Sequence, residues 1–109
     1  MFETDFRFYE KCRFDSRYRV NGITGRVINE HNRILGQRNG RPGIINLKTR
    51  RGPVWRVIYE HYIDKIPRNW MVYHKDGDKT NNCLLNLDAI SFKEEALREK
   101  RNLAKASRR

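Results

Sequence analysis

The feature that most constrains this chain is a single histidine, His74, set between two short apolar runs and followed by a polar loop. Residues 70–72 lead into it, and after the loop the second run has Leu84, Leu85, Leu87 and Ile90. The loop is rich in Asp, Gly and Asn, which hydrogen-bond nearby backbone groups or tolerate positive φ. Two short strands joined by this loop would hold His74 at a strand end beside polar groups. A general base is expected in such a position.

Two helices are predicted, one on each side of this segment. Pro53 suits a first helical turn, and apolar residues recur at three- and four-residue spacing over 54–63. Ser91 and Glu94 have the spacing of a capping box, which predicts a helix from about Phe92 to Ala106. We expect four apolar side chains of this second helix to face the core: Phe92, Ala96, Leu97 and Leu103.

Short β-prone pieces broken by Gly, Asn and Pro fill residues 18–47, which predicts a small antiparallel meander. The expected fold class is therefore α+β: an N-terminal antiparallel sheet, a helix, and then a strand–strand–helix unit. The predicted division is a strand-rich module at 1–52 that contacts a polyanion, and a second unit at 53–109. At 109 residues, we expect both to form one compact domain.

The charge of the chain points to a polyanionic partner. Lys and Arg total 24 against 13 acidic residues, a net charge of +11. Residues 1–50 carry 11 basic and 5 acidic groups, and residues 93–109 carry 7 and 3, whereas 51–92 are nearly balanced with 6 and 5. Ribosome- and RNA-associated proteins are equally basic, so charge predicts the class of partner and leaves the activity open.

Cysteine content and hydropathy exclude several other classes. Cys12 and Cys83 are the two cysteines, with no Cys-x-x-Cys spacing, which argues against a disulfide framework and a structural zinc. The chain has no long apolar run, and its first ten residues are too charged for a signal peptide. These observations predict a reducing, cytoplasmic location without a membrane partner.

The segment around His74 fits the pattern H-x-D-G-[DN]-x-x-N-N-x-x-x-N-L. Its eight defined positions are His74, Asp76, Gly77, Asp78, Asn81, Asn82, Asn86 and Leu87. This segment resembles the core of the HNH endonucleases, the ββα-metal nucleases of phages and mobile introns. The resemblance extends upstream through 54–60 and downstream into the helix after Ser91, and more weakly to the strand module that often precedes such domains.

The resemblance implies a role for each residue of the pattern. His74 would be the general base, and Asn86 would orient it by a hydrogen bond. The remaining polar residues would mainly shape the loop; these are Asp76, Gly77, Asp78, Asn81 and Asn82.

The resemblance also implies one divalent cation, Mg²⁺ or Mn²⁺, with no zinc expected. Family members usually place Asp or His directly before the base, where this chain has Tyr73, a neutral phenol and a poor ligand for a hard cation. The second ligand position of the family, in the first turns of the following helix, corresponds to Glu95.

Two functions follow as hypotheses. The first is a metal-dependent HNH endonuclease of the phage or homing type that nicks or cleaves double-stranded DNA. It would act as a monomer in the cytoplasm of the host cell, alone or with a phage or host protein partner. The second is a binding module for DNA or protein that has lost catalysis, a reading supported by Tyr73. In either case the predicted DNA contacts are Arg38, Arg41, Lys48, Arg50, Arg51, Lys75, Lys79, Arg98, Arg101 and Lys105.

Overall fold

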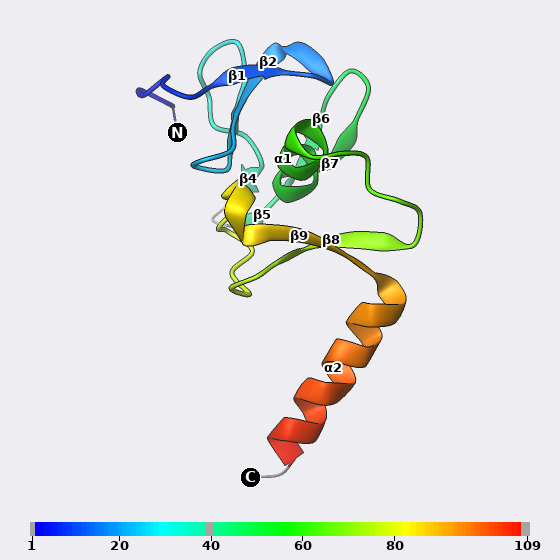
Figure 1. Ribbon diagram of the computed structural model, residues 1–109. Coiled ribbons are helices and arrows are strands. Elements are labelled where there is room, and N and C mark those ends of the chain that lie inside the picture. The colour runs from blue at the N-terminus through cyan, green and yellow to red at the C-terminus, as the bar shows by residue number, and fades with distance from the viewer. Residues whose placement is uncertain (1, 39–40, 108–109) are drawn as a thin grey trace.

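The computed structural model describes residues 2–38 and 41–107, and it describes side chains except those of 37–42, 99 and 101–107. Figure 1 shows the elements along the chain. The strands are β1 (Glu10–Cys12), β2 (Asp15–Asn21), β3 (Arg26–Ile28), β4 (Gln37–Arg38), β5 (Arg41–Pro42), β6 (Ile44–Asn46), β7 (Arg51–Pro53), β8 (Trp70–His74) and β9 (Leu87–Ser91). The helices are α1 (Val54–Tyr62), the short 3₁₀ helix η1 (Leu84–Asn86) and α2 (Phe92–Ser107).

All strand pairs in the described residues are antiparallel, and they form four small sheets. β1, β2 and β3 make a three-stranded sheet, and β4–β5, β6–β7 and β8–β9 are two-stranded. The β8–β9 pair is followed directly by α2, so the C-terminal part is the predicted strand–strand–helix unit. The α+β fold class predicted from the sequence is confirmed.

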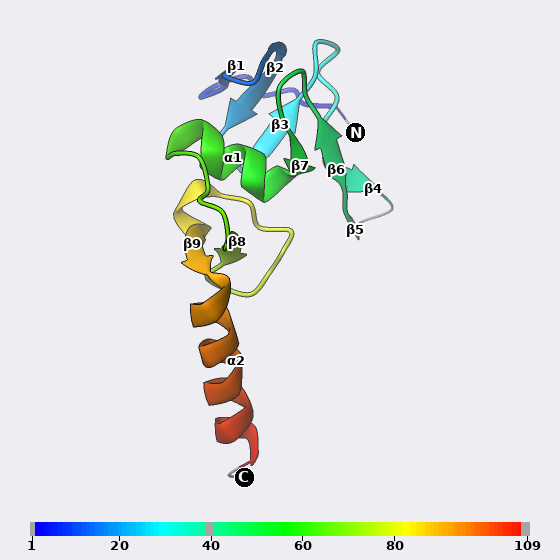
Figure 2. The same ribbon diagram turned by 90° about the vertical axis from the view of Figure 1, so that its right-hand side faces the viewer.

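Helix α1 lies between the N-terminal sheet and the β8–β9 pair (Figures 1 and 2). Its side chains Val57 and Ile58 are completely buried. The core around them takes buried residues from both neighbours, including Val20 and Val27 of the N-terminal sheet and Val72 and Leu87 of the hairpin. Each such side chain contributes about 1.5–3 kcal/mol when it leaves water. One core therefore contains residues from both sides of position 52. The predicted division into modules 1–52 and 53–109 stays a prediction.

A charged group is buried on the same helix. The side chain of Glu60 is 0% exposed, and its two oxygens face two arginines: Arg50 Nε at 2.8 Å and Arg56 Nε at 3.1 Å. The Arg56 contact has hydrogen-bond geometry, whereas the Arg50 contact is a close ion pair without it. The carboxylate links β7 and its preceding turn to α1, since a buried charge is stable only when it is paired.

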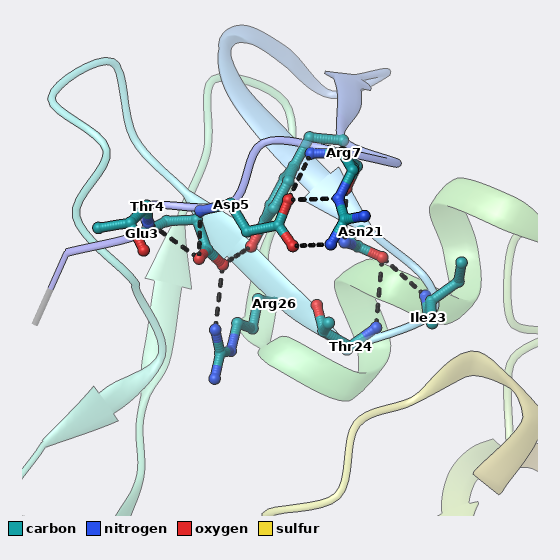
Figure 3. Close-up of polar contacts among 9 residues, drawn as sticks. Glu3, Thr4, Asp5, Arg7, Asn21, Ile23, Thr24 and Arg26 are labelled. Carbon is teal, nitrogen blue, oxygen red and sulfur yellow. Dashed lines mark hydrogen bonds and ion pairs between the residues drawn. The ribbon is translucent and has the colours of Figure 1, made fainter.

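The N-terminal segment is held by a second carboxylate, that of Glu3 (Figure 3). Tyr9 Oη donates a hydrogen bond to it at 2.5 Å, Arg26 Nη1 lies at 3.1 Å, and the backbone N–H groups of Thr4 and Asp5 also donate to it. The pKa of Glu3 is lowered to about 2, chiefly by the Tyr9 hydrogen bond. This cluster fastens the chain ahead of β1 onto β3.

Helix α2 begins as predicted but packs differently. Ser91 Oγ accepts a hydrogen bond from the backbone N–H of Glu94 at 3.2 Å, so the serine cap is present. The expectation that Phe92, Ala96 and Leu97 face the core is wrong, because Phe92 is 55% and Leu97 49% exposed, and Ala96 is exposed too. Figures 1 and 2 show the reason: α2 runs away from the body of the molecule, whose longest dimension is 51 Å. The Leu103 side chain lies outside the described residues.

The second apolar run also differs from the expectation in part. Leu84 and Leu85 belong to η1, Leu85 is exposed, and the strand starts only at Leu87. In the part of the chain that the structure describes, no helix combines the length and apolar character required to span a membrane.

Candidate active site

His74 ends strand β8, opposite Leu87 of β9, and its side chain is 7% exposed. The ring nitrogen Nε2 lies 2.8 Å from Asn82 Oδ1. The ring of Trp55 on α1 meets the imidazole edge-on, with 5.0 Å between the ring centroids and an angle of 75°. The imidazole is thus held from two directions, by the loop and by α1. An amide oxygen only accepts, so in the neutral imidazole Nε2 carries the proton and Nδ1 has the free lone pair.

Asp76 is the centre of the loop that follows. Its carboxylate accepts hydrogen bonds from Asn81 Nδ2 and Asn86 Nδ2, both at 2.9 Å, and from the backbone N–H of Asp78 at 2.8 Å. These donors lower the pKa of Asp76, with Asn81 contributing most. Gly77 has a φ of +78°, which suits glycine at the tip of the turn. Asp76, Gly77, Asp78 and Asn81 thus have contacts or a backbone conformation within the loop, and the loop-shaping function of the five predicted positions stays a prediction.

The expected hydrogen bond from Asn86 to His74 is absent from this described segment. Asn86 Nδ2 donates to Asp76 Oδ1 and to the backbone oxygen of Asn81, and Asn86 Oδ1 accepts from the backbone N–H of Asp76. Both ends of this amide are therefore used within the loop, and Asn82 takes the place beside His74. The motif contains three asparagines of equal chemistry, and only the path of the loop decides which one reaches the imidazole.

Sequence reasoning also missed Trp55. Its periodicity assigned it to the core, and it does pack partly against the core while touching His74. Trp55 and His74 lie 19 positions apart in the chain, and no local sequence pattern indicates that they are in contact.

Tyr73 and Glu95, at the two ligand positions that the resemblance implies, both contact Arg98. Glu95 Oε2 is buried and has no hydrogen-bond partner, and its nearest cationic atom is Arg98 Nη1 at 3.9 Å. A buried, unsatisfied carboxylate oxygen is a suitable donor for a hard divalent cation. Within the described ranges, no group of three or more His, Cys, Asp or Glu side chains gathers for a metal. The residues therefore fit a cation that takes one protein carboxylate and completes its shell with phosphate oxygens and water.

The predicted DNA-contacting residues fall into three groups. Lys48, Arg51, Lys75 and Lys79 are exposed. Arg50 and Arg98 have intramolecular partners: Arg50 faces Glu60 and lies 4.8 Å from the centroid of the Phe14 ring, and Arg98 lies over Tyr73. Because its guanidinium is committed to Glu60, Arg50 is better explained as a stabilising residue. The side chains of Arg38, Arg41, Arg101 and Lys105 lie outside the described residues.

Comparison with known proteins agrees with this geometry. Residues 54–97, which include α1, β8, the loop, β9 and the first turns of α2, match the family model described as HNH endonuclease. No curated protein sequence matches the chain significantly.

A solved structure described as "DNA binding and cleavage by the HNH homing endonuclease I-HmuI" is similar to this chain, with a TM-score of 0.66 and 20% sequence identity. The match covers 92% of this chain and 64% of that one, so this chain spans less than two thirds of that enzyme. At this identity the likeness shows a shared fold. Residues 54–97 therefore match the HNH endonuclease family model, within a chain whose fold is shared with an HNH homing endonuclease.

Proposed function

We propose that this protein is a metal-dependent endonuclease that hydrolyses phosphodiester bonds in double-stranded DNA, with His74 as the general base. The observation that carries the proposal is the state of His74: it is buried at a strand end and anchored through Nε2. Its Nδ1 atom is then available as a base. A histidine placed only for packing does not require this arrangement.

The chemistry follows from the residues. Nδ1 of His74 accepts a proton from a water molecule as the water oxygen attacks phosphorus. The bond from phosphorus to the leaving sugar oxygen breaks, and that oxygen takes a proton from solvent. Glu95 would hold the divalent cation, which neutralises charge on the phosphate and the leaving oxygen when bound. Mg²⁺ and Mn²⁺ are the expected ions for a carboxylate ligand.

Charge supports DNA as the partner. The net charge is +11, and exposed lysines at positions 75 and 79 lie in the loop that follows His74. The solved neighbour is described for DNA binding and cleavage, which makes duplex DNA the first substrate to test. One active site in one HNH unit favours nicking by a monomer. A phage or homing origin, a cytoplasmic site of action and a phage or host protein partner remain parts of the proposal.

The test is a nicking assay on supercoiled plasmid with Mg²⁺, Mn²⁺ or EDTA. Wild type is expected to convert the plasmid to open circles with either metal, and His74→Ala to bind the plasmid without cutting it. Because His74 is buried, His74→Gln serves as a second variant, and thermal unfolding verifies that both fold. If the wild-type protein binds the plasmid but does not cut it with either Mg²⁺ or Mn²⁺, the proposal is wrong.

One observation favours the second candidate, a DNA-binding module without catalysis. Arg98 Cζ lies 4.7 Å from the centroid of the Tyr73 ring, so a cation already stacks at the position where family members place a metal ligand. Under this reading wild type and His74→Ala would bind DNA equally and neither would cut it.

A further inference from the structure

We propose that Asn82 is the positioning residue of the catalytic histidine, and that the turn at residues 21–25 of the N-terminal sheet holds Asn82 in place. This inference rests on the proposed function, because it assigns the residue that makes His74 a base. It also gives the N-terminal sheet a function in catalysis in addition to its predicted contact with DNA.

The first step is the contact itself. His74 and Asn82 are both buried, at 7% and 8% exposure, and their polar atoms are 2.8 Å apart. A hydrogen bond sheltered from water restricts the imidazole more strongly than an exposed one. The amide oxygen also selects the tautomer, since it requires the proton on Nε2. A rotated amide would place its NH₂ group there, force the proton onto Nδ1 and take the free lone pair away from that atom.

The second step is the support behind Asn82. Gly25 has a φ of +71°, and a Cβ atom at this position would lie 2.1 Å from the carbonyl carbon of Asn82 and 2.3 Å from its oxygen. The backbones of the two segments therefore touch, and only glycine permits the approach. Two residues further along, the backbone N–H of Leu84 donates to the carbonyl of Gly22 at 2.7 Å.

The third step is the rigidity of the turn that provides this support. The buried side chain of Asn21 accepts hydrogen bonds from the backbone N–H groups of Ile23 at 2.8 Å and Thr24 at 3.2 Å, as Figure 3 shows. Its Nδ2 donates to the backbone oxygen of Arg7 at 3.2 Å. Because the hydrogen bonds of Asn21 make this turn rigid, the turn supports the segment at residues 82–84. Small displacements of catalytic groups cost large factors in rate, so this support matters for kcat.

The experiment compares wild type with Asn82→Ala, Asn82→Asp and the control Asn29→Ala. Asn29 also accepts two backbone hydrogen bonds in a turn, from His31 and Arg33, but it belongs to the N-terminal sheet region away from His74. Two kinds of quantity are measured on the intact chain: kcat and KM for plasmid nicking, and the His74 tautomer from ¹⁵N NMR of the imidazole ring.

Wild type should show the Nε2–H tautomer. Asn82→Ala should lose this tautomer preference and reduce kcat by about 10- to 100-fold with KM within about twofold, the factor typical of outer-shell partners that orient metal-ligating histidines. Asn82→Asp retains the acceptor and should restore the tautomer and most of kcat. Asn29→Ala should match wild type in both measurements.

Wild-type His74 with its proton on Nδ1, or Asn82→Ala with unchanged kcat and tautomer, would overturn the proposal. If Asn82→Ala does not fold, the proposal is tested by the tautomer of wild-type His74 and by the kcat and tautomer of Asn82→Asp. If wild type cuts no DNA, the proposed function fails, whereas the tautomer still supports or contradicts the contact between Asn82 and His74.

Discussion

The guanidinium of Arg98 lies over the ring of Tyr73, with 4.7 Å between Cζ and the ring centroid. The same guanidinium is 3.9 Å from the buried Oε2 of Glu95. A cation–π contact of this kind contributes about 0.5–2 kcal/mol. Tyr73 therefore holds the positive charge of Arg98 beside Glu95. A metal-ligating side chain at position 73 would instead attract a metal ion to Glu95.

The substitution Tyr73→Asp should strengthen metal binding, because it adds a second carboxylate next to Glu95. We expect the Mn²⁺ concentration that gives half-maximal nicking to fall about tenfold or more, the effect expected of an added ligand-shell carboxylate. Calorimetry of Mn²⁺ binding provides a measurement independent of cleavage. The control is Tyr73→Phe, which retains the ring under Arg98 and should retain the wild-type metal requirement. An unchanged requirement in Tyr73→Asp would contradict the assignment of this position.

Asn86 should matter for stability of the loop. The substitution Asn86→Asp replaces a donor to Asp76 by a second carboxylate, so a favourable contact at 2.9 Å becomes repulsive. We expect the free energy of unfolding at pH 7 to fall by about 1–3 kcal/mol, more than for Asn86→Ala, as measured by urea denaturation.

The same repulsion predicts the pH dependence of this variant. The paired carboxylates raise the pKa of one of the two in the folded state. The difference in unfolding free energy from Asn86→Ala should therefore narrow as the pH falls from 7 toward the ordinary Asp pKa of about 4, where this carboxyl is already protonated in the folded protein. The exposed Asn46 is the control, because Asn46→Asp adds the same charge away from the loop. Equal stability of the two Asn86 variants at pH 7 would argue against the contact with Asp76.

Acid should weaken the N-terminal cluster through Glu3. Its pKa is lowered from the ordinary 4.5 to about 2, first by the Tyr9 hydroxyl and then by the backbone N–H of Asp5 and by Arg26. A carboxylate with a lowered folded pKa stabilises the fold above its unfolded pKa, and this contribution is lost as the pH falls from about 4.5 toward 2.

The variant Glu3→Gln isolates this contribution, since Asp5 and Asp15 also have lowered pKa values. Its urea midpoint should be lower than that of wild type at pH 7, and the difference should shrink as the pH approaches 2. A difference that stays constant from pH 7 to 2 would mean that the charge of Glu3 contributes nothing.

Glu60 should be required for the fold around α1. Removing it by Glu60→Ala leaves Arg50, which is 27% exposed, without its buried partner. We expect a loss of about 2–3 kcal/mol in the free energy of unfolding, somewhat below the value for a fully buried pair. The control Glu94→Ala removes an exposed carboxylate and should change stability far less. A loss below that of the control would show that the two arginines find other partners.

Local features of the sequence predicted much of this molecule. The helix over α1, the serine cap of α2, the strand that delivers His74 and the turn chemistry of the Asp76 loop all follow from spacing within a few residues. The prediction that one face of α2 packs in the core was wrong. Apolar periodicity indicates that a helix has an apolar face, but it does not indicate that another element covers this face.

The sequence by itself therefore determined the α+β elements, the basic surface charge and the loop that carries His74, since each depends on residues close together in the chain. Only the tertiary structure decided which asparagine contacts His74, which arginines pair with Glu60, and that Arg98 stacks on Tyr73. Two further contacts join distant segments: Trp55 of α1 packs against His74, and the turn at Gly25 packs against the backbone of Asn82. Even the choice between Asn82 and Asn86, both near in sequence, depends on a loop path that this packing sets.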